Sequence, residues 1–318
     1  MALQRGARGR EVTRLEIRLN ELGLYDGGFD DAFGGGVEKG VVKFQQQRGL
    51  PATGAVDDAT SRALFADPSP RLAAVKGKSL DFRCLMLTSL FETGQGVPGC
   101  FGTLAGNFDK QGISFGVLQW NLGQGTLQTL LKRLNATHPE VIKEAFGNGR
   151  DELVGILSAG KQAGLAFAAT VQDAKNRVTE PTRSRFRALG ATPECQAAQL
   201  ESAAGFFATG RALFAEYGLV SERGMALMFD VAVQNGSIRP ATRAQIFADF
   251  AGIPAGAPRE EREVARMRII ANRRADASNA RADVRSRKLA IAEGVGVVHG
   301  LGVDVERHYG LTLAPAQP

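Results

Sequence analysis

Apolar residues recur at helical spacing in three short segments near the start of the chain. In EVTRLEIRLNELG they fall three or four positions apart, and the closing Gly23 stands where a glycine commonly ends a helix. VEKGVVKFQQQRGL repeats the pattern. DDATSRALF adds a shorter segment, with Asp57 or Asp58 placed to cap its first turn. We therefore predict a small three-helix bundle over residues 1–66.

Residues 67–78 have the composition of a linker, because two prolines are followed by small and basic residues. Beyond this linker the helical period dominates again. Further helices are predicted in SLDFRCLMLTSLFE and in the segments 127–134, 151–159, 193–217, 222–233, 259–274 and 280–292. Few stretches alternate with period two, so strands are expected only in the glycine-rich region 104–120. The predicted fold class is mainly α: a bundle, a linker, and an α-rich domain over 79–318 with a small β region.

The composition is that of a soluble globular protein. Of the 318 residues, 44% are hydrophobic and 23% are charged. No apolar run approaches the roughly 18 residues of a membrane span, and MALQRGARGREVTRL lacks the apolar core of a secretory signal. Cys84, Cys100 and Cys195 are too few and too scattered for a disulfide framework. We expect a monomer that is made in a reducing cytoplasm.

Positive charge is concentrated near the C-terminal end. The net charge is +6, and the segment 259–288 holds ten basic and five acidic residues. This bias favours a polyanionic partner, such as nucleic acid, an anionic membrane face or an acidic wall polymer, or else a solvated helix face. With one Trp and three Tyr in the chain, a stacking platform for nucleic acid is not expected.

The segment FETGQGVPGCFGTLAGNFDKQGISFGVLQWN contains motifs of three different chemistries. GQGVPG has the glycine spacing of a dinucleotide loop, but a helix precedes it and no helix follows. GISFG has the spacing of a nucleophile elbow around Ser114, but no buried strand precedes it. Cys100 with His299 or His308 would make a thiol nucleophile and its base, although no local pattern supports them. Both nucleophile hypotheses are weak but remain open.

Two carboxylates in the same segment, Glu92 and Asp109, fit general acid–base chemistry better. Cleavage of a glycosidic bond needs an acid that protonates the leaving oxygen and a base that activates water. Glu92 ends an apolar helix, which favours a protonated acid, and Asp109 lies in a polar loop, which favours an ionised base. The alternative is that Glu92 is an ordinary surface residue and Asp109 a turn former.

The surroundings of these carboxylates resemble the lysozyme superfamily, which includes goose-type lysozymes, lytic transglycosylases and family 46 chitosanases. FETG resembles the helix end that carries the catalytic Glu, and SFGVLQW resembles the Gly-Leu-Met-Gln segment that follows. DKQGISFGV resembles the run that begins with the general-base aspartate of chitosanases. MFDVAVQNG and DVRSRKLAIAEG resemble two of their later helices.

This resemblance implies Glu92 as general acid and Asp109 as general base, with inversion at the anomeric carbon. The two carboxyls should then lie roughly 6.5–9.5 Å apart. Arg285 and Arg287 would adjust the charge around Asp109, or would simply belong to a basic helix.

Residues 1–66 resemble the peptidoglycan-binding domain 1 family of cell-wall hydrolases. GARGREVTRLEIRLNELG, FDDAFGGGVEKGVVKFQ and GLPATGAVDDATSRAL match its opening, middle and end. The sequence departs from the family pattern at Asp31, which replaces a usual glycine, and at Val37, which replaces a usual threonine.

Together the two resemblances point to the glycan strand of peptidoglycan as substrate. The predicted function is a peptidoglycan hydrolase, with N-acetylmuramidase favoured over a lytic transglycosylase, a glucosaminidase or a chitosanase-like glycosidase. Gln119, Asn121 and Asn235 are the predicted sugar contacts, and no metal or other cofactor is expected. Alternatives of another class are a wall amidase or endopeptidase, and a non-catalytic wall-binding phage protein.

The order of the parts also resembles endolysins of phages that infect Gram-negative hosts. Such an enzyme is made in the host cytoplasm and acts on peptidoglycan in the periplasm. The basic C-terminal segment would then contact the anionic wall or outer-membrane surface.

Overall fold

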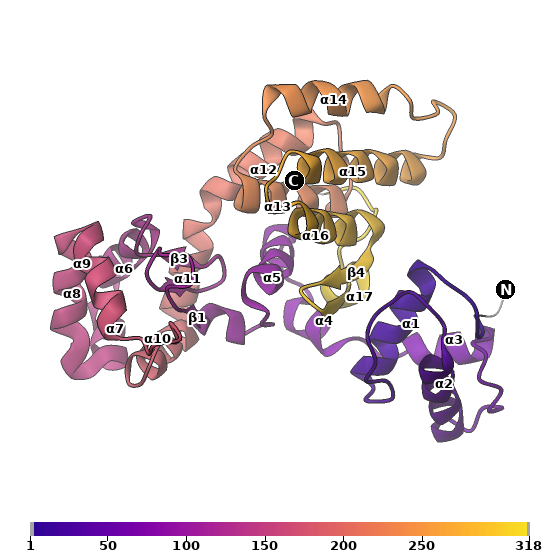
Figure 1. Cartoon of the computed structure of the whole chain (residues 1–318), viewed down its shortest axis with the longest axis horizontal. Coiled ribbons are helices and arrows are strands. Elements are labelled where there is room, and N and C mark those ends of the chain that lie inside the picture. Colours follow the sequence, from indigo (N-terminus) through magenta and orange to yellow (C-terminus); the bar gives the residue numbers. More distant parts are fainter. Residues whose placement is uncertain (1–2, 317–318) are drawn as a thin grey trace. The chain divides into compact units, whose positions relative to one another are not determined.

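The computed structural model describes residues 3–316, which are helical apart from two small antiparallel sheets (Figure 1). The internal contacts define two compact units. The first unit comprises the described residues up to Cys84 together with those from Gly210 onward, and the second unit is Leu85–Thr209. The two divisions of the chain fall within α5 (Leu80–Thr93) and just inside α12 (Ala204–Glu216). The predicted mainly α fold class is confirmed.

The first unit begins with a three-helix bundle, which we call the N-terminal module. Its helices are α1 (Arg10–Glu21), α2 (Gly35–Gln47) and α3 (Asp58–Phe65). The core consists of Val12, Leu15, Leu19, Phe33, Val37, Val41, Phe44, Val56 and Leu64. Asp57 is the N-cap of α3, because its Oδ1 accepts a hydrogen bond from the Thr60 N–H at 2.7 Å. The predicted bundle is confirmed.

The segment predicted as a linker contains a short helix, α4 (Pro70–Val75). Ser69 caps its first turn and Val75 is fully buried. The predicted parts were residues 1–66, 67–78 and 79–318. The two compact units divide the chain at other positions. The predicted boundaries therefore stay predictions. Residues 1–2 and 317–318 lie outside the described residues.

The rest of the first unit is a helical lobe with one β-hairpin. Its elements are α13 (Glu222–Asn235), α14 (Pro240–Phe250), α15 (Arg259–Asp276), α16 (Arg281–Glu293), β4 (Val295–Val298), β5 (Leu301–Asp304) and α17 (Val305–Tyr309). The expectation that strands occur only in region 104–120 was wrong. The turn residues His299 and Gly300 both have positive φ, 51° and 77°, as a tight two-residue hairpin turn requires. His-Gly is not among the usual sequences of such a turn, so the sequence did not signal the hairpin.

The second unit is built from short helices around a three-stranded sheet. Its elements are η1 (Gly99–Gly102), β1 (Leu104–Ala105), β2 (Ser114–Phe115), β3 (Trp120–Asn121), α6 (Thr126–Thr137), α7 (Pro139–Phe146), η2 (Gly147–Gly149), α8 (Arg150–Ala159), α9 (Lys161–Thr170), α10 (Thr182–Ala191) and α11 (Pro193–Ser202). The single helix predicted over 193–217 was wrong, since α11 and α12 are separate helices that meet at the buried Ala203. The sequence analysis also missed α7, α9, α10 and α14.

Charged contacts join the N-terminal module to the hairpin and to α17. Arg14 of α1 donates to Asp304 at 3.0 Å. His308 accepts from the Asp304 N–H at Nδ1, so its Nε2 carries the proton and donates to Glu21 at 2.7 Å. Burial would raise the pKa of Glu21, but the hydrogen bond from His308, together with Arg307 and Arg18, lowers it to about 2. The module is thus held by interactions that need an ionised Glu21.

One carboxyl inside the module has no such partner. Glu16 of α1 is fully buried, and neither of its carboxyl oxygens has a hydrogen-bond partner within the described residues. Burial raises the pKa of Glu16 to about 7, and the neighbouring Asp30 adds to the rise. Glu16 therefore resists ionisation in the folded state.

Glu16→Gln should stabilise the module at alkaline pH. The folded-state pKa of Glu16 lies above the ordinary value of 4.5. The protonated carboxyl therefore contributes its full stability below pH 4.5, and this contribution is lost as the pH rises through about 7. Relative to the wild type, we expect a gain of about 2 kcal/mol at pH 8 and little change at pH 5. Hydrogen-exchange protection of the α1 amides in the full chain measures this, with the surface variant Glu38→Gln as control. Equal protection at pH 8 would contradict the prediction.

Candidate active site

Glu92 lies at the end of α5, where the helix emerges from the interior. Every residue from Cys84 to Phe91 is buried, whereas Glu92 is half-buried. Gly94 ends the helix with a φ of 68°, and its N–H donates to Leu90 O at 2.8 Å. The Thr93 hydroxyl donates to Ser89 O at 2.7 Å and accepts from the Gln95 N–H at 3.0 Å. The Glu92 side chain thus projects from a fixed helix end.

Asp109 lies in the loop between β1 and β2 of the small sheet. These strands are antiparallel, with Leu104 opposite Phe115 and Ala105 opposite Ser114. Asp109 is exposed, and its Oδ1 accepts a hydrogen bond from the Gln111 N–H at 3.0 Å. The carboxylate is thus open to solvent and held by a backbone hydrogen bond. The neighbouring Phe108 is 67% exposed.

Amide side chains hold this loop closed. Asn107 Oδ1 accepts from the Gly112 N–H at 2.7 Å, and the Asn107 N–H donates to Gln172 Oε1 at 2.7 Å. A Cβ atom at Gly106 would collide with Asn176 O, so only glycine fits there. The loop that carries Asp109 is therefore anchored at both ends and against the segment after α9.

Two of the predicted sugar contacts also have roles within the fold. Gln119 has a φ of 51°, and its Nε2 donates to Gly116 O at 2.9 Å. Asn121 is 8% exposed, and its Oδ1 accepts from the Gln124 N–H at 2.8 Å. These contacts shape the turns before and after β3. Sugar binding by Gln119 and Asn121 stays a prediction.

Gln199 of α11 is a positioning residue that the sequence analysis missed. It is fully buried, its Oε1 accepts from the Val117 N–H at 3.0 Å, and its Nε2 donates to Phe101 O at 3.0 Å. One amide thus joins η1 to the turn between β2 and β3. A Cβ atom at Gly116 would collide with it, and Gly116 has a φ of 79°. Nothing near Gln199 in the sequence signals this role, because its partners are 98 and 82 positions away.

The alternative nucleophiles lie in unsuitable surroundings. Ser114 is on β2 and is followed by a turn, whereas a nucleophile elbow leads from a strand into a helix. Cys100 is buried, and desolvation raises the pKa of its thiol. Desolvation also raises the pKa of Cys84, and that of Cys195 to about 11. Thiols of this kind are poor nucleophiles.

Asn235, the remaining predicted sugar contact, lies in the first unit, whereas Glu92, Asp109, Gln119 and Asn121 lie in the second. Asn235 is the last residue of α13, and its Oδ1 is buried without a hydrogen-bond partner among the described residues. An unpaired buried carbonyl oxygen is costly unless a ligand or water meets it. The structure therefore leaves Asn235 open as a ligand contact.

The two later helices singled out by resemblance, α13 and α16, share a buried ion cluster. Asp230 is fully buried between Arg287 at 2.6 Å and Lys288 at 2.9 Å. Burial would raise the pKa of Asp230, but the charges of Arg287 and Lys288 lower it. Arg285, in contrast, pairs with Asp276 at 2.8 Å. Arg287 therefore does not simply belong to a basic helix face, because it forms an ion pair with the buried Asp230.

The described residues contain neither a candidate metal site nor a candidate membrane span. Among residues 3–316, no three His, Cys, Asp or Glu side chains are grouped so that they could hold a metal ion. Within the same residues, every helix is too short or too polar to cross a membrane.

Comparison with known proteins identifies the N-terminal module. Residues 8–64 match the sequence model of the family described as "Putative peptidoglycan binding domain". The chain is also 39% identical over 62 residues to the spore cortex-lytic enzyme of Bacillus cereus. That alignment covers 20% of this chain and spans 24% of the relative. The family match confirms the resemblance predicted for this module.

Solved chitosanase structures are similar over more of the chain. The native chitosanase of Bacillus subtilis is 20% identical and has a TM-score of 0.44, over 69% of this chain and 87% of that one. The family 46 chitosanase of Gynuella sunshinyii, in complex with chitotetraose, is 16% identical and has a TM-score of 0.43, over 72% and 88%. This likeness in fold is weak, and we draw no activity from it.

Gln199→Leu should destabilise the second unit. The substitution leaves Phe101 O and the Val117 N–H buried without partners, each at a cost of about 1–3 kcal/mol. We expect a loss of about 2–4 kcal/mol, seen as an earlier unfolding transition of Trp120 fluorescence. Trp120 is the chain's one tryptophan and lies on β3. Gln196→Ala, a half-buried position on the same helix, is the control. An unchanged transition in Gln199→Leu would show that the amide does not hold the turn.

Proposed function

We propose that this protein is a peptidoglycan hydrolase that cleaves the glycan strand as an N-acetylmuramidase. The observation that carries the proposal is the pair of carboxylates in one compact unit, in contrasting surroundings, in a chain that also carries the N-terminal module. Glu92 follows the buried part of α5, residues 84–91, and Asp109 stands exposed on an anchored loop. The family that the N-terminal module matches supports peptidoglycan as the polymer that is bound.

In the proposed mechanism Glu92 donates a proton to the glycosidic oxygen as the bond to the anomeric carbon breaks. Asp109 takes a proton from a water molecule that attacks the opposite face of the sugar, which inverts the configuration. The acid must be protonated and the base ionised when the substrate binds. This geometry needs a carboxyl separation of roughly 6.5–9.5 Å in the complex with substrate.

The second candidate is a lytic transglycosylase, which uses one carboxylate and the substrate's own hydroxyl group. The position of Asp109 favours the hydrolase, because a transglycosylase has no need of an exposed carboxylate on an anchored loop. A chitosanase-like glycosidase would share both carboxylates. The N-terminal module favours peptidoglycan over chitosan as substrate.

Glu92→Gln should abolish release of soluble glycan fragments from purified peptidoglycan sacculi. An amide cannot donate the proton, so we expect a fall in rate of about 10²–10⁴-fold. Asp109→Asn should lower the rate by a similar factor in a hydrolase and leave a transglycosylase nearly unaffected. Glu144→Gln on the exposed face of α7 is the control. A native rate in Glu92→Gln would exclude this mechanism.

Contact between the basic C-terminal segment and the anionic wall or outer membrane also remains a proposal. Much of the segment's charge is used within the fold, because Arg273 pairs with Asp249 and Arg268 with Glu293 at 2.7 Å. The surface charge available to a partner is therefore smaller than the sequence indicates. Adsorption to sacculi that does not change with salt would contradict the contact.

The biological setting proposed from the sequence is that of a phage endolysin. In this setting the protein is made in the host cytoplasm and acts in the periplasm. The proposed activity does not depend on that setting.

A further inference from the structure

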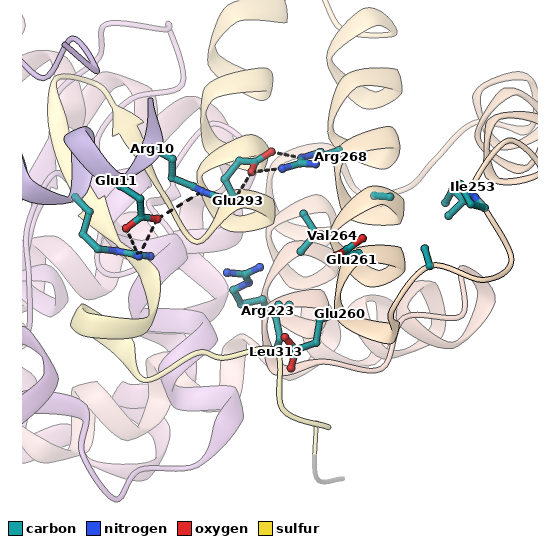
Figure 2. A pocket seen from close by; sticks show the side chains of 14 residues that line it. Arg10, Glu11, Arg223, Ile253, Glu260, Glu261, Val264, Arg268, Glu293 and Leu313 are labelled. Atoms are coloured by element: carbon teal, nitrogen blue, oxygen red, sulfur yellow. Dashed lines mark hydrogen bonds and ion pairs between the residues drawn. The ribbon is translucent and has the colours of Figure 1, made fainter. Parts of the chain in front are cut away.

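The first unit contains an open cavity of about 610 Å³ where the N-terminal module meets the helical lobe. Residues of α1, α15, the start of α13 and the end of α16 line it, and Figure 2 shows their side chains arranged around one space. This volume is within the usual range of small-ligand sites. None of the residues assigned to the proposed reaction lines the cavity.

Arg223 of α13 is a buried cation that lines this cavity. It is 7% exposed, and its Nη2 donates to Ala292 O at 3.1 Å. Its Nε is buried with no acceptor, and no carboxylate within the described residues pairs with it. Desolvation lowers the pKa of Arg223 to about 10. A Cβ atom at Gly294 would collide with the guanidinium, so glycine is required to seat it.

A buried guanidinium without a carboxylate is costly in a folded protein, and an anionic ligand would offset that cost. The one acid at the end of α16, Glu293, is already engaged. It accepts from Arg10 at 2.9 Å and from Arg268 at 2.7 Å. Arg223 is therefore available to an incoming carboxylate.

The first turn of α15 lines the same cavity with the opposite charge. Glu260 and Glu261 are exposed, and neither forms an ion pair with another described residue. Apolar side chains, among them Val264, Ile253 and Leu313, complete the lining. The cavity thus combines a buried cation, exposed carboxylates and apolar surface, and this combination suits a ligand that carries both charges together with small apolar groups.

We propose that this cavity binds a peptide that carries free carboxylates and an amino group, the chemistry of the stem peptides of peptidoglycan. One carboxylate would pair with Arg223, the amino group with Glu260 and Glu261, and methyl groups would contact Val264 and Leu313. The choice of stem peptides as the source rests on the proposed function. Because α1 contributes Arg10 and Arg14 to the lining, the module and the lobe would bind the peptide together.

The test is calorimetric titration of the full chain with N-acetyl-L-alanyl-γ-D-glutamyl-meso-diaminopimelate, which contains no sugar. Glu260→Gln/Glu261→Gln should weaken binding at least about tenfold, whereas Glu144→Gln/Glu152→Gln, which removes the same charge from exposed helix positions in the second unit, should not. Acetylation of the peptide's remaining amino group should weaken binding to the wild type by the same factor. Arg223→Gln should also abolish binding, with thermal unfolding used to verify that this variant folds.

Absence of binding at millimolar peptide would overturn the proposal. Equal binding by wild type and Glu260→Gln/Glu261→Gln would also overturn the proposal. The peptide would then bind elsewhere, or bind through its carboxylates without its amino group. The same protein is assayed on sacculi to separate this proposal from the proposed function. If the peptide binds but the sacculi release no sugar, the cavity assignment stands and the proposed function fails. If the sacculi release sugar but the peptide does not bind, only the cavity assignment fails.

Discussion

The end of α5 is the constraint on which the proposed activity depends. Residues 84–91 are buried on all sides, so this part of the helix has no solvent-facing stripe. The helix must therefore reach solvent at its end, and Gly94 stops it two residues after Glu92. The general acid of the proposed reaction therefore stands where the buried part of the helix ends.

Amide side chains connect the loops of the second unit. Gln199 joins η1 to the turn after β2, and Gln172 joins the Asp109 loop to the segment after α9. These contacts are hydrogen bonds between uncharged groups. The first unit is different, since Arg14, Glu21 and His308 link the N-terminal module to the lobe through charge. Amide hydrogen bonds thus join the loops of the second unit, whereas charged side chains hold the N-terminal module to the lobe.

The sequence predicted the parts of the fold that have local signals. The N-terminal module was predicted because its apolar period, its glycines and the Asp57 cap all lie within short segments. The β4–β5 hairpin was missed because its turn uses His299, a residue that seldom adopts positive φ. The break at Ala203 was missed because alanine favours a continuous helix, and tertiary packing overrides that preference. Glu92 and Asp109 were singled out from local context, but Gln199 and Arg223 were not, since their partners are distant in sequence.

Identification of the new chain ends in digested peptidoglycan tests the central claim most directly. Purified sacculi would be incubated with the full chain and the soluble fragments analysed by mass spectrometry. Two carboxylates acting as general acid and base predict fragments that end in reducing N-acetylmuramic acid. Fragments that carry only new free amino groups, with the glycan strands intact, would contradict glycan cleavage by this protein.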